Sequence, residues 1–316
     1  MQNCTDANKN KPFPGYIDPD SLIVQDDYVF VQLTSGGRPH YYVSYRRSTF
    51  AQMKLPKYAL PKDMHVISTD ENQVFAAVQE WNQNDTYNLY ISDTRGVYFT
   101  LALENVQSSR GPEGNVMIDL YEVAGIKGMF LANKKIDNQV KTFITYNKGR
   151  DWRLLQAPDA DLRGDPVHCL LGEACIMGAK RIYKKRKSER KCMQGKYAGA
   201  MESEPCVCTE ADFDCDYGYE RHSNGQCLPA FWFNPSSLSK DCSLGQSYLN
   251  STGYRKVVSN NCTDGVREQY TAKPQKCPGK APRGLRIVTA DGKLTAEQGH
   301  NVTLMVQLEE PVAINL

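Results

Sequence analysis

Long apolar runs are the first feature that this sequence lacks. None of its 316 residues falls in an apolar stretch of the roughly 18 residues that a membrane-spanning helix needs, and residues 1–20 contain no apolar signal-peptide core. A strong net charge is also missing, because 38 basic and 36 acidic side chains leave a formal charge of +2. Whole-chain electrostatics therefore favour neither nucleic acid nor an anionic membrane surface as a partner.

Familiar catalytic and cofactor-binding motifs are absent as well. The sequence contains no Walker loop, no G-x-G-x-x-G and no G-x-S-x-G. Its histidines show no helix-spaced pairing and no neighbouring nucleophile motif, so each is interpreted as a surface or packing residue: His40, His65, His168, His222 and His300. The sequence therefore predicts a non-catalytic protein with no cofactor and no metal.

Cysteine is distributed very unevenly along the chain. Cys4 and Cys169 stand apart, and the other nine lie within about a hundred residues, at the density of a disulfide scaffold. We expect disulfides at Cys175, Cys192, Cys206, Cys208, Cys215, Cys227, Cys242, Cys262 and Cys277. The pairing cannot be deduced from these positions.

Five N-x-S/T sequons agree with an oxidising compartment, and they predict glycosylation at Asn3, Asn84, Asn250, Asn261 and Asn301. Secretory chemistry without a signal peptide indicates an internal piece of a longer precursor, or a variant product that has lost its start.

Short β-branched and aromatic runs fill residues 21–165 and are separated by turn residues, with no sustained helical period. The clearest predicted strands are residues 28–33, 41–44, 65–68, 73–78, 87–92, 128–132 and 140–146.

Three of these runs enter a similar turn, in which a Ser or Thr leads through polar residues to an aromatic residue. The best copy is residues 145–152; residues 92–99 lack the central acid or amide, and residues 44–50 are one residue shorter and lack glycine. Their spacing of about 50 residues suits four-stranded propeller blades. The pattern resembles the Asp box, and a structural role in the turn is predicted for Ser92, Gly96, Phe99, Thr145, Asn147, Gly149 and Trp152.

Two further regions follow. Residues 172–283 replace hydrophobic periodicity by closely spaced cysteines, so disulfide bridges should substitute for a large core. In residues 284–310, alternating apolar positions flank an Asp291-Gly292 turn, which predicts the opening strands of an antiparallel sandwich.

This order of modules resembles the sortilin-type receptors with a Vps-ten domain, and the local sequence is similar to their SorCS subgroup. The stretches that carry the resemblance are residues 146–152, 164–169, 172–175 and 206–219, and it extends over nearly the whole chain, to about Glu310. It implies a type I membrane receptor of the cell surface, endosome and Golgi, whose ten-bladed propeller binds secreted peptides, propeptides or growth factors. It implies no catalysis.

The expected fold is therefore mainly β, in three parts. Residues 1–171 form a partial Asp-box β-propeller of about three blades, residues 172–283 a disulfide-rich module, and residues 284–316 the truncated start of an immunoglobulin-like, polycystic-kidney-disease-type sandwich. The sequence departs from the family by jumping at Leu171-Gly172 from the propeller to the module, which has nine cysteines where the family has ten. An internally deleted and truncated fragment or splice product is the interpretation.

The segment from Lys180 to Lys191 holds eight basic residues in twelve. This segment could be a solvated face of a hairpin or a site that binds a polyanion, either heparan sulfate or an acidic propeptide. The residues that would bind the polyanion are Lys184, Lys185, Arg186 and Lys187.

Two other local patterns are weaker. Cys206, Cys208, Cys215 and His222 supply ligand types for zinc, but no C-x-x-C pair exists and the sequons favour oxidation. Arg163-Gly164-Asp165 is an integrin-type tripeptide whose occurrence chance explains.

Three functions compete at this point. A receptor fragment that binds secreted ligands leads. A sialidase-like glycoside hydrolase is the alternative because Asp boxes also occur there, although no arginine triad can be placed. A non-binding decoy that keeps only contacts between modules is the third.

Overall fold

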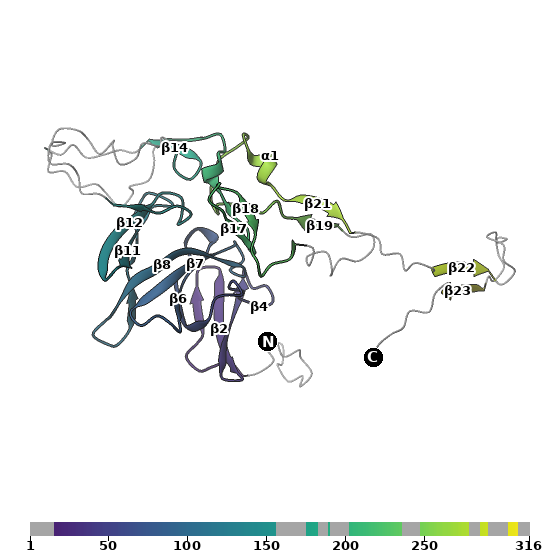
Figure 1. The fold of residues 1–316 in the computed structure, drawn as a ribbon, viewed down its shortest axis with the longest axis horizontal. Coiled ribbons are helices and arrows are strands. Elements are labelled where there is room, and N and C mark those ends of the chain that lie inside the picture. The colour runs from purple at the N-terminus through teal and green to yellow at the C-terminus, as the bar shows by residue number, and fades with distance from the viewer. Residues whose placement is uncertain are drawn as a thin grey trace, which may run out of the picture. The chain divides into compact units, whose positions relative to one another are not determined.

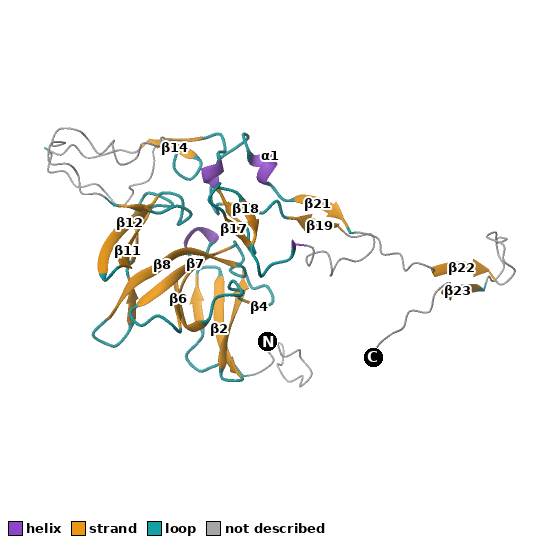
Figure 2. Ribbon diagram, in the orientation of Figure 1, coloured by secondary structure: helices purple, strands orange, loops and turns teal. Residues whose placement is uncertain are grey.

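Almost all regular structure in the computed structural model is β-strand (Figures 1 and 2). The structure describes residues 16–155, 175–182, 189, 202–235, 247–277, 285–289 and 303–308. The helical elements are short: α1 (Arg267–Tyr270) and the 3-10 turns η1 (Asp70–Asn72) and η3 (Glu210–Asp212). None of the described helices is long and apolar enough to cross a membrane.

The first sheet is a four-stranded antiparallel meander in the order β1-β2-β3-β4. Its strands are β1 (Ile23–Gln25), β2 (Tyr28–Ser35), β3 (Arg38–Tyr45) and β4 (Ala51–Gln52). Because side chains alternate across a strand, Tyr28 and Phe30 enter one core cluster while Val31 and Leu33 enter another. Both faces of β2 are therefore buried, as in a propeller blade that lies between neighbours.

The second sheet has nine strands and contains two further meanders. Its main path runs β13-β12-β11-β8-β7-β6-β5, with β9 on β8 and β10 on β11. The strands are β5 (Pro61–Ser68), β6 (Phe75–Glu80), β7 (Thr86–Ser92), β8 (Phe99–Arg110), β9 (Val116–Ile118), β10 (Leu120–Glu122), β11 (Phe130–Ile136), β12 (Gln139–Thr145) and β13 (Arg153–Leu154).

Strands β8 and β11 meet at a single residue pair, Val106 opposite Lys134. That narrow junction separates the meander β5–β8 from the meander β10–β13. Together with β1–β4, the described residues thus form three four-stranded antiparallel units, and the prediction of a mainly β fold with a partial propeller is confirmed.

Large apolar side chains fill the space between these units. The main cluster joins the first sheet to β6, β7 and β8, and its most deeply buried members include Tyr28, Val43, Val74, Tyr90 and Phe99. A second cluster, against which Trp152 packs, lies along β7, β8 and β11.

Short strands and disulfides replace such a core in the cysteine-rich part. Its strands are β14 (Ala179–Ile182), β15 (Glu202–Pro205), β16 (Phe213–Cys215), β17 (Tyr219–Arg221), β18 (Cys227–Pro229) and β20 (Tyr254–Lys256). The structure pairs Cys175 with Cys206, Cys208 with Cys262, and Cys215 with Cys227. Cys277 is also disulfide-bonded. Cys192 and Cys242, like Cys4 and Cys169, lie outside the described residues.

The chain divides into two compact units. One comprises Met1–Asn234 and Thr252–Thr271, and the other Pro235–Ser251 and Ala272–Leu316. In the second unit, β19 (Ser247–Asn250) pairs with β21 (Lys273–Lys276), and β22 (Leu285–Thr289) pairs with β23 (Leu304–Leu308). The antiparallel pair β22–β23 lies where the sequence predicts opening sandwich strands. The module boundaries after residues 171 and 283 stay predictions.

Candidate functional site

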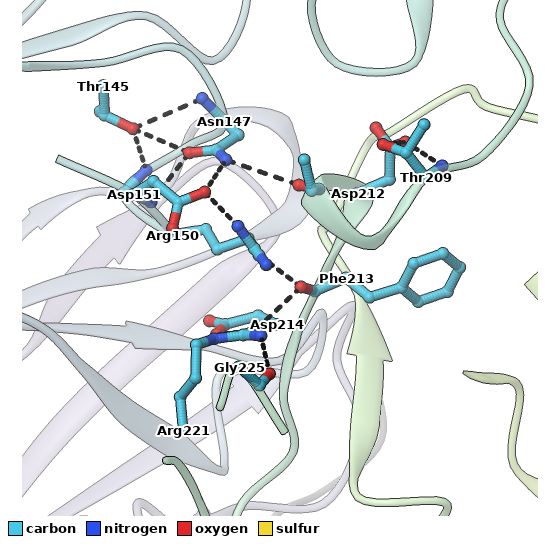
Figure 3. Close-up of polar contacts among 12 residues, drawn as sticks. Thr145, Asn147, Arg150, Asp151, Thr209, Asp212, Phe213, Asp214, Arg221 and Gly225 are labelled. Atoms are coloured by element: carbon cyan, nitrogen blue, oxygen red, sulfur yellow. Dashed lines mark hydrogen bonds and ion pairs between the residues drawn. The ribbon is translucent and has the colours of Figure 1, made fainter. Parts of the chain in front are cut away.

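The turn after β12 is closed by its own side chains (Figure 3). The hydroxyl of Thr145 accepts a hydrogen bond from the Gly149 amide at 3.0 Å and donates to Asn147 Oδ1 at 3.1 Å. Asn147 Oδ1 also accepts the Asp151 amide at 3.0 Å. Gly149 has a φ of +89°, which L-residues with a side chain rarely adopt. Thr145 and Asn147 are thus occupied in shaping the turn.

Trp152 anchors this turn on the sheet. It packs against two apolar clusters, and both of them include residues of β7 and β11. A Cβ on Gly149 would lie 3.4 Å from the Phe75 ring and 3.6 Å from the Trp152 ring, so the turn approaches the core closely. The indole Nε1 of Trp152 is buried with no acceptor among the described residues.

The turn after β7 is closed by the acidic side chain of Asp93. Asp93 Oδ1 accepts hydrogen bonds from the Val97 amide at 2.8 Å and the Tyr98 amide at 3.3 Å. The Ser92 hydroxyl accepts from the Val74 amide at 2.9 Å. Phe99 is fully buried, and Gly96 has a φ of +73°. Sequence reasoning assigned no acid to this turn because it looked only at the central position of the motif, and Asp93 lies one residue before it.

The turn after β3 is the most divergent copy. The Ser44 hydroxyl donates to the Ser48 carbonyl at 2.6 Å. Arg46 and Arg47 adopt positive φ in place of a glycine, and Phe50 packs against Val31 and Leu33.

The turn after β12 also contacts the cysteine-rich part within the same compact unit. Arg150 Nε donates to the Phe213 carbonyl at 2.5 Å, and its guanidinium also pairs with Asp151. From the other side, Arg221 Nη2 donates to that same carbonyl at 3.2 Å and Arg221 Nη1 donates to the Gly225 carbonyl at 2.9 Å. Figure 3 shows both guanidinium groups pointing at the Phe213 carbonyl. The Phe213 carbonyl therefore accepts hydrogen bonds from both Arg150 and Arg221.

The segment before Phe213 is held in place by a capping box. Asp212 Oδ2 accepts hydrogen bonds from the Thr209 amide at 2.8 Å and from its hydroxyl at 3.1 Å, which closes the short helix η3. Asn147 Nδ2 donates to Asp151 Oδ2 at 2.8 Å and lies 3.5 Å from the Ala211 carbonyl. Asn147 therefore links the turn to η3 as well as closing the turn.

Arg255 on β20 makes a second link between the cysteine-rich part and the blades. Its Nη2 donates to Thr100 Oγ1 at 2.5 Å and lies 3.4 Å from the Ile91 carbonyl. Asp214 lies 3.9 Å from both Arg255 and Arg221. A third link is the Tyr217 hydroxyl, which donates to the Leu55 carbonyl at 3.2 Å. Burial raises the pKa of Tyr217, so the hydroxyl stays a donor at neutral pH.

Two cavities lie along these links. One of about 350 Å³ is lined by Asn147, Asp151, Met177, Thr209 and Asp212 among others. The other, of about 460 Å³, lies between β8 and β17 and includes Tyr58, Glu104, Tyr219, Glu220 and Trp232 in its lining. Either volume accommodates one or two side chains of a peptide.

The polar groups of this region mainly hold the turn and the cysteine-rich part in place. Most of its charges are paired, and many of its amide and hydroxyl groups bond backbone or side-chain atoms of the protein. The disulfides exclude the zinc alternative, because Cys206, Cys208 and Cys215 are oxidised and cannot be thiolate ligands. Among the described residues, no group of three or more metal-ligating side chains comes together.

Three of the predicted glycosylation sites can be placed. Asn84 is exposed in the loop between β6 and β7, Asn250 is exposed at the end of β19, and Asn261 is exposed beside the buried Cys262. Asn3, Asn301, the basic residues Lys184, Lys185, Arg186 and Lys187, and the tripeptide Arg163-Gly164-Asp165 lie outside the described residues.

Comparison with known proteins gives two family matches. The model described as sortilin, neurotensin receptor 3 matches residues 1–198, and the model of the C-terminal region of sortilin, neurotensin receptor 3 matches residues 164–277.

Curated relatives extend the similarity over the chain. The human VPS10 domain-containing receptor SorCS1 is 63% identical over 476 residues, which cover 98% of this chain and 41% of that protein. Mouse SorCS3 is 46% identical over 98% of this chain and 39% of its own length. The vacuolar protein sorting/targeting protein 10 of Mycosarcoma maydis is 39% identical over 39% of this chain and 8% of its own length.

The chain spans about two fifths of the length of the SorCS1 relatives that it matches. The aligned span of 476 residues is also longer than the chain's 316 residues. The relatives therefore carry an internal segment that has no counterpart here, and its place after Leu171 stays a prediction.

Proposed function

Because this chain belongs to the family of sortilin-type Vps10-domain receptors, we propose that it is part of the lumenal or extracellular region of a type I sorting receptor. The parent receptor binds secreted peptides, propeptides or growth factors and directs their trafficking between the cell surface, endosomes and Golgi. The single observation that carries the proposal is the identity of 63% with the SorCS1 receptor over 98% of this chain.

The redox chemistry of the chain supports a secretory location. Cys208 and Cys262 are almost fully buried and bonded to each other, and Cys215 is bonded to Cys227. Such disulfides persist in oxidising compartments and are rare in the cytosol. Exposed sequons such as Asn84 fit the same compartment.

The links between blades and cysteine-rich part support a binding role over a catalytic one. Arg150, Arg255 and Tyr217 each donate to an oxygen on the other part, so three hydrogen bonds hold the cysteine-rich part against the blades. A rigid junction with two side-chain-sized cavities suits recognition of a peptide.

The proposal is tested by expressing the chain behind a secretory signal and measuring its binding to a secreted propeptide, beside the complete ectodomain of a SorCS1 relative. Saturable binding by both, with a dissociation constant for the chain within about tenfold of the ectodomain's, is the expected result. If only the ectodomain binds the propeptide, ligand recognition requires segments outside this chain.

A non-binding decoy is the second candidate function. The observation that favours it is the internal segment that the relatives carry and this chain lacks. In the same experiment, a folded and glycosylated chain that leaves the propeptide unbound supports the decoy.

A heparan sulfate partner is proposed for the basic residues Lys184, Lys185, Arg186 and Lys187. Charge reversal of these four residues is expected to lower the salt concentration that elutes the secreted chain from heparin. An unchanged elution would assign them to a solvated face.

A further inference from the structure

Aromatic rings line the cavity between β8 and β17, here called the aromatic cleft and defined by Tyr58, Tyr219 and Trp232. The rings of Tyr58 and Trp232 are edge-to-face at 69°, with centroids 6.4 Å apart. Trp232 makes a second edge contact with Tyr217 at 5.4 Å. Tyr58 is 39% exposed, so part of its ring is free to receive a ligand. Its hydroxyl has no hydrogen-bond partner in the part of the chain that the structure describes.

The charges in the lining of the cleft are of two kinds. The first kind is internally compensated: Arg150 pairs with Asp151, and Arg221 lies 3.9 Å from Asp214. Arg255, just outside the cleft, also lies 3.9 Å from Asp214. Each of these guanidinium groups also donates to a protein oxygen, so their charge is at least partly compensated within the protein.

The second kind is uncompensated and negative. Glu104 on β8 and Glu220 on β17 line the cleft, and both are exposed. Neither has an ion-pair or hydrogen-bond partner among the residues that the structure describes. Two carboxylates from different parts of the chain therefore face one opening without a cation.

These carboxylates also affect the pKa of Tyr58 in the aromatic cleft. Burial raises the pKa of Tyr58 to about 12, and Glu220, Glu80 and Glu104 add to the shift in that order. Glu80 is engaged with the Tyr90 hydroxyl at 3.1 Å and Asn88 at 3.2 Å. These donors are neutral, so Glu80 also adds negative charge near the Tyr58 ring, while Glu104 and Glu220 are the carboxylates that line the cleft without a partner among the described residues.

We propose that the aromatic cleft binds the cationic side chain of a basic peptide, with the cation against the rings of Tyr58 and Trp232 and balanced by Glu104 and Glu220. Aromatic faces attract arginine and lysine cations, and the attraction grows when the site excludes water. The two carboxylates supply the charge complementarity that selects a basic ligand over an acidic one. This inference rests on the proposed function, because it names the class of secreted peptide that the receptor takes.

The test uses the full chain, secreted and folded, and a fluorescein-labelled peptide Gly-Arg-Pro-Lys-Gly. Its neutral isostere carries citrulline in place of arginine and acetyl-lysine in place of lysine. Binding is measured by fluorescence anisotropy for the unaltered chain, the double variant Glu104→Gln/Glu220→Gln, Tyr58→Leu, and the control Glu113→Gln. Glu113 is an exposed acid in the loop between β8 and β9, away from the cleft. Circular dichroism checks that each variant folds.

The basic peptide should bind the unaltered chain and the control equally, and the double variant at least about tenfold more weakly. The neutral isostere should bind the unaltered chain at least about tenfold more weakly as well, and Tyr58→Leu should lose several-fold in affinity. Displacement of the peptide by tetramethylammonium would identify the isolated cation as sufficient. Displacement only by unlabelled peptide would identify the cation within a peptide as the ligand.

Equal binding of the neutral isostere, an unaffected double variant, or no binding of the basic peptide would overturn the inference. These outcomes are distinguishable from failure of the proposed function. If a secreted propeptide binds the chain and the double variant equally, the receptor function stands and only the cleft assignment falls.

Discussion

At the residue scale, one carboxylate decides how the turn after β7 closes. Asp93 Oδ1 accepts both the Val97 and the Tyr98 amide. We expect Asp93→Ala to lower the free energy of unfolding by about 1–3 kcal/mol, because the Val97 amide is buried and loses its acceptor. Asp93→Asn keeps an oxygen at Oδ1 and should cost less. Urea denaturation of the three proteins measures this, and equal stability of Asp93→Ala and the unaltered chain would contradict the assigned role.

Two glycines separate backbone strain from crowding. Gly96 and Gly114 both have positive φ, at +73° and +81°. A Cβ on Gly96 would lie 3.2–3.3 Å from side chains of the main core cluster, whereas a Cβ on Gly114 would meet nothing within 4 Å. Gly114→Ala should therefore cost about 1–2 kcal/mol of stability from the backbone alone, and Gly96→Ala clearly more. Melting temperatures of the two variants measure the difference, and a larger loss for Gly114→Ala would show that crowding at Gly96 is relieved by repacking.

The local sequence pattern predicts only part of the structure of these turns. The spacing from Thr145 to Trp152 predicts a closed turn because every group that closes it lies within the motif. Asp93 escaped prediction although it is adjacent to Ser92, since the motif places its acid one residue later. Arg150 stands at a position of the turn motif that the pattern leaves open, and Asp214 and Arg255 lie outside the turn motifs. They become a group only when residues more than sixty positions apart along the chain fold together.

At the element scale, β8 shows the same limit. Each of the seven clearest predicted strands in residues 21–165 overlaps an observed strand, but the twelve-residue β8 is not among them. Glu104 and Asn105 interrupt its apolar pattern, and Asn105 has a φ of +58°. The register against β7 shifts twice along the strand. An irregular strand that is stabilised by partners on both sides leaves a weak local signal.

The links that hold β16–β18 beside the blades provide a test at this scale. Tyr217→Phe removes the donor to the Leu55 carbonyl, and Arg255→Met removes the donor to Thr100. We expect amide exchange in residues 213–229 to quicken by roughly fivefold for each lost bond, since one such bond contributes about 1 kcal/mol. Tyr248→Phe is the matched control, because its hydroxyl bonds Gln275 within the other compact unit. Amide exchange is measured by mass spectrometry. If exchange in residues 213–229 quickens equally in the control, the two hydrogen bonds do not stabilise this segment specifically.

At the scale of the whole molecule, glycosylation reports the compartment. Asn84 and Asn250 are exposed, so both should carry glycans after secretion, and peptide-N-glycosidase should lower the apparent mass. Asn84→Gln and Asn250→Gln should each remove one step of that shift. Asn261 should be used less, because its sequon contains Cys262, which is buried in a disulfide. An unshifted mass in material that entered the endoplasmic reticulum would contradict a secretory location.

The number of cysteines sets the behaviour of the chain expressed alone. Eleven cysteines cannot all pair within one chain, so at least one thiol stays free or pairs with another molecule. Cys175–Cys206, Cys208–Cys262 and Cys215–Cys227 span 31, 54 and 12 residues within the cysteine-rich part, which should keep these bridges because its apolar cluster is small. Three blade-like units also lack the radial closure that protects sheet edges in a propeller, and their two terminal blades expose faces that would otherwise meet neighbours. We therefore expect retention in the cell or disulfide-linked oligomers, visible on non-reducing gels.

Single cysteine variants test this expectation. Cys4→Ser or Cys169→Ser makes the number of cysteines even and should reduce the oligomers, whereas Cys208→Ser exposes a new thiol and should increase them. A protease-resistant monomer of the unaltered chain that binds a propeptide as the complete ectodomain does would show that neither the odd cysteine nor the open edges limit folding.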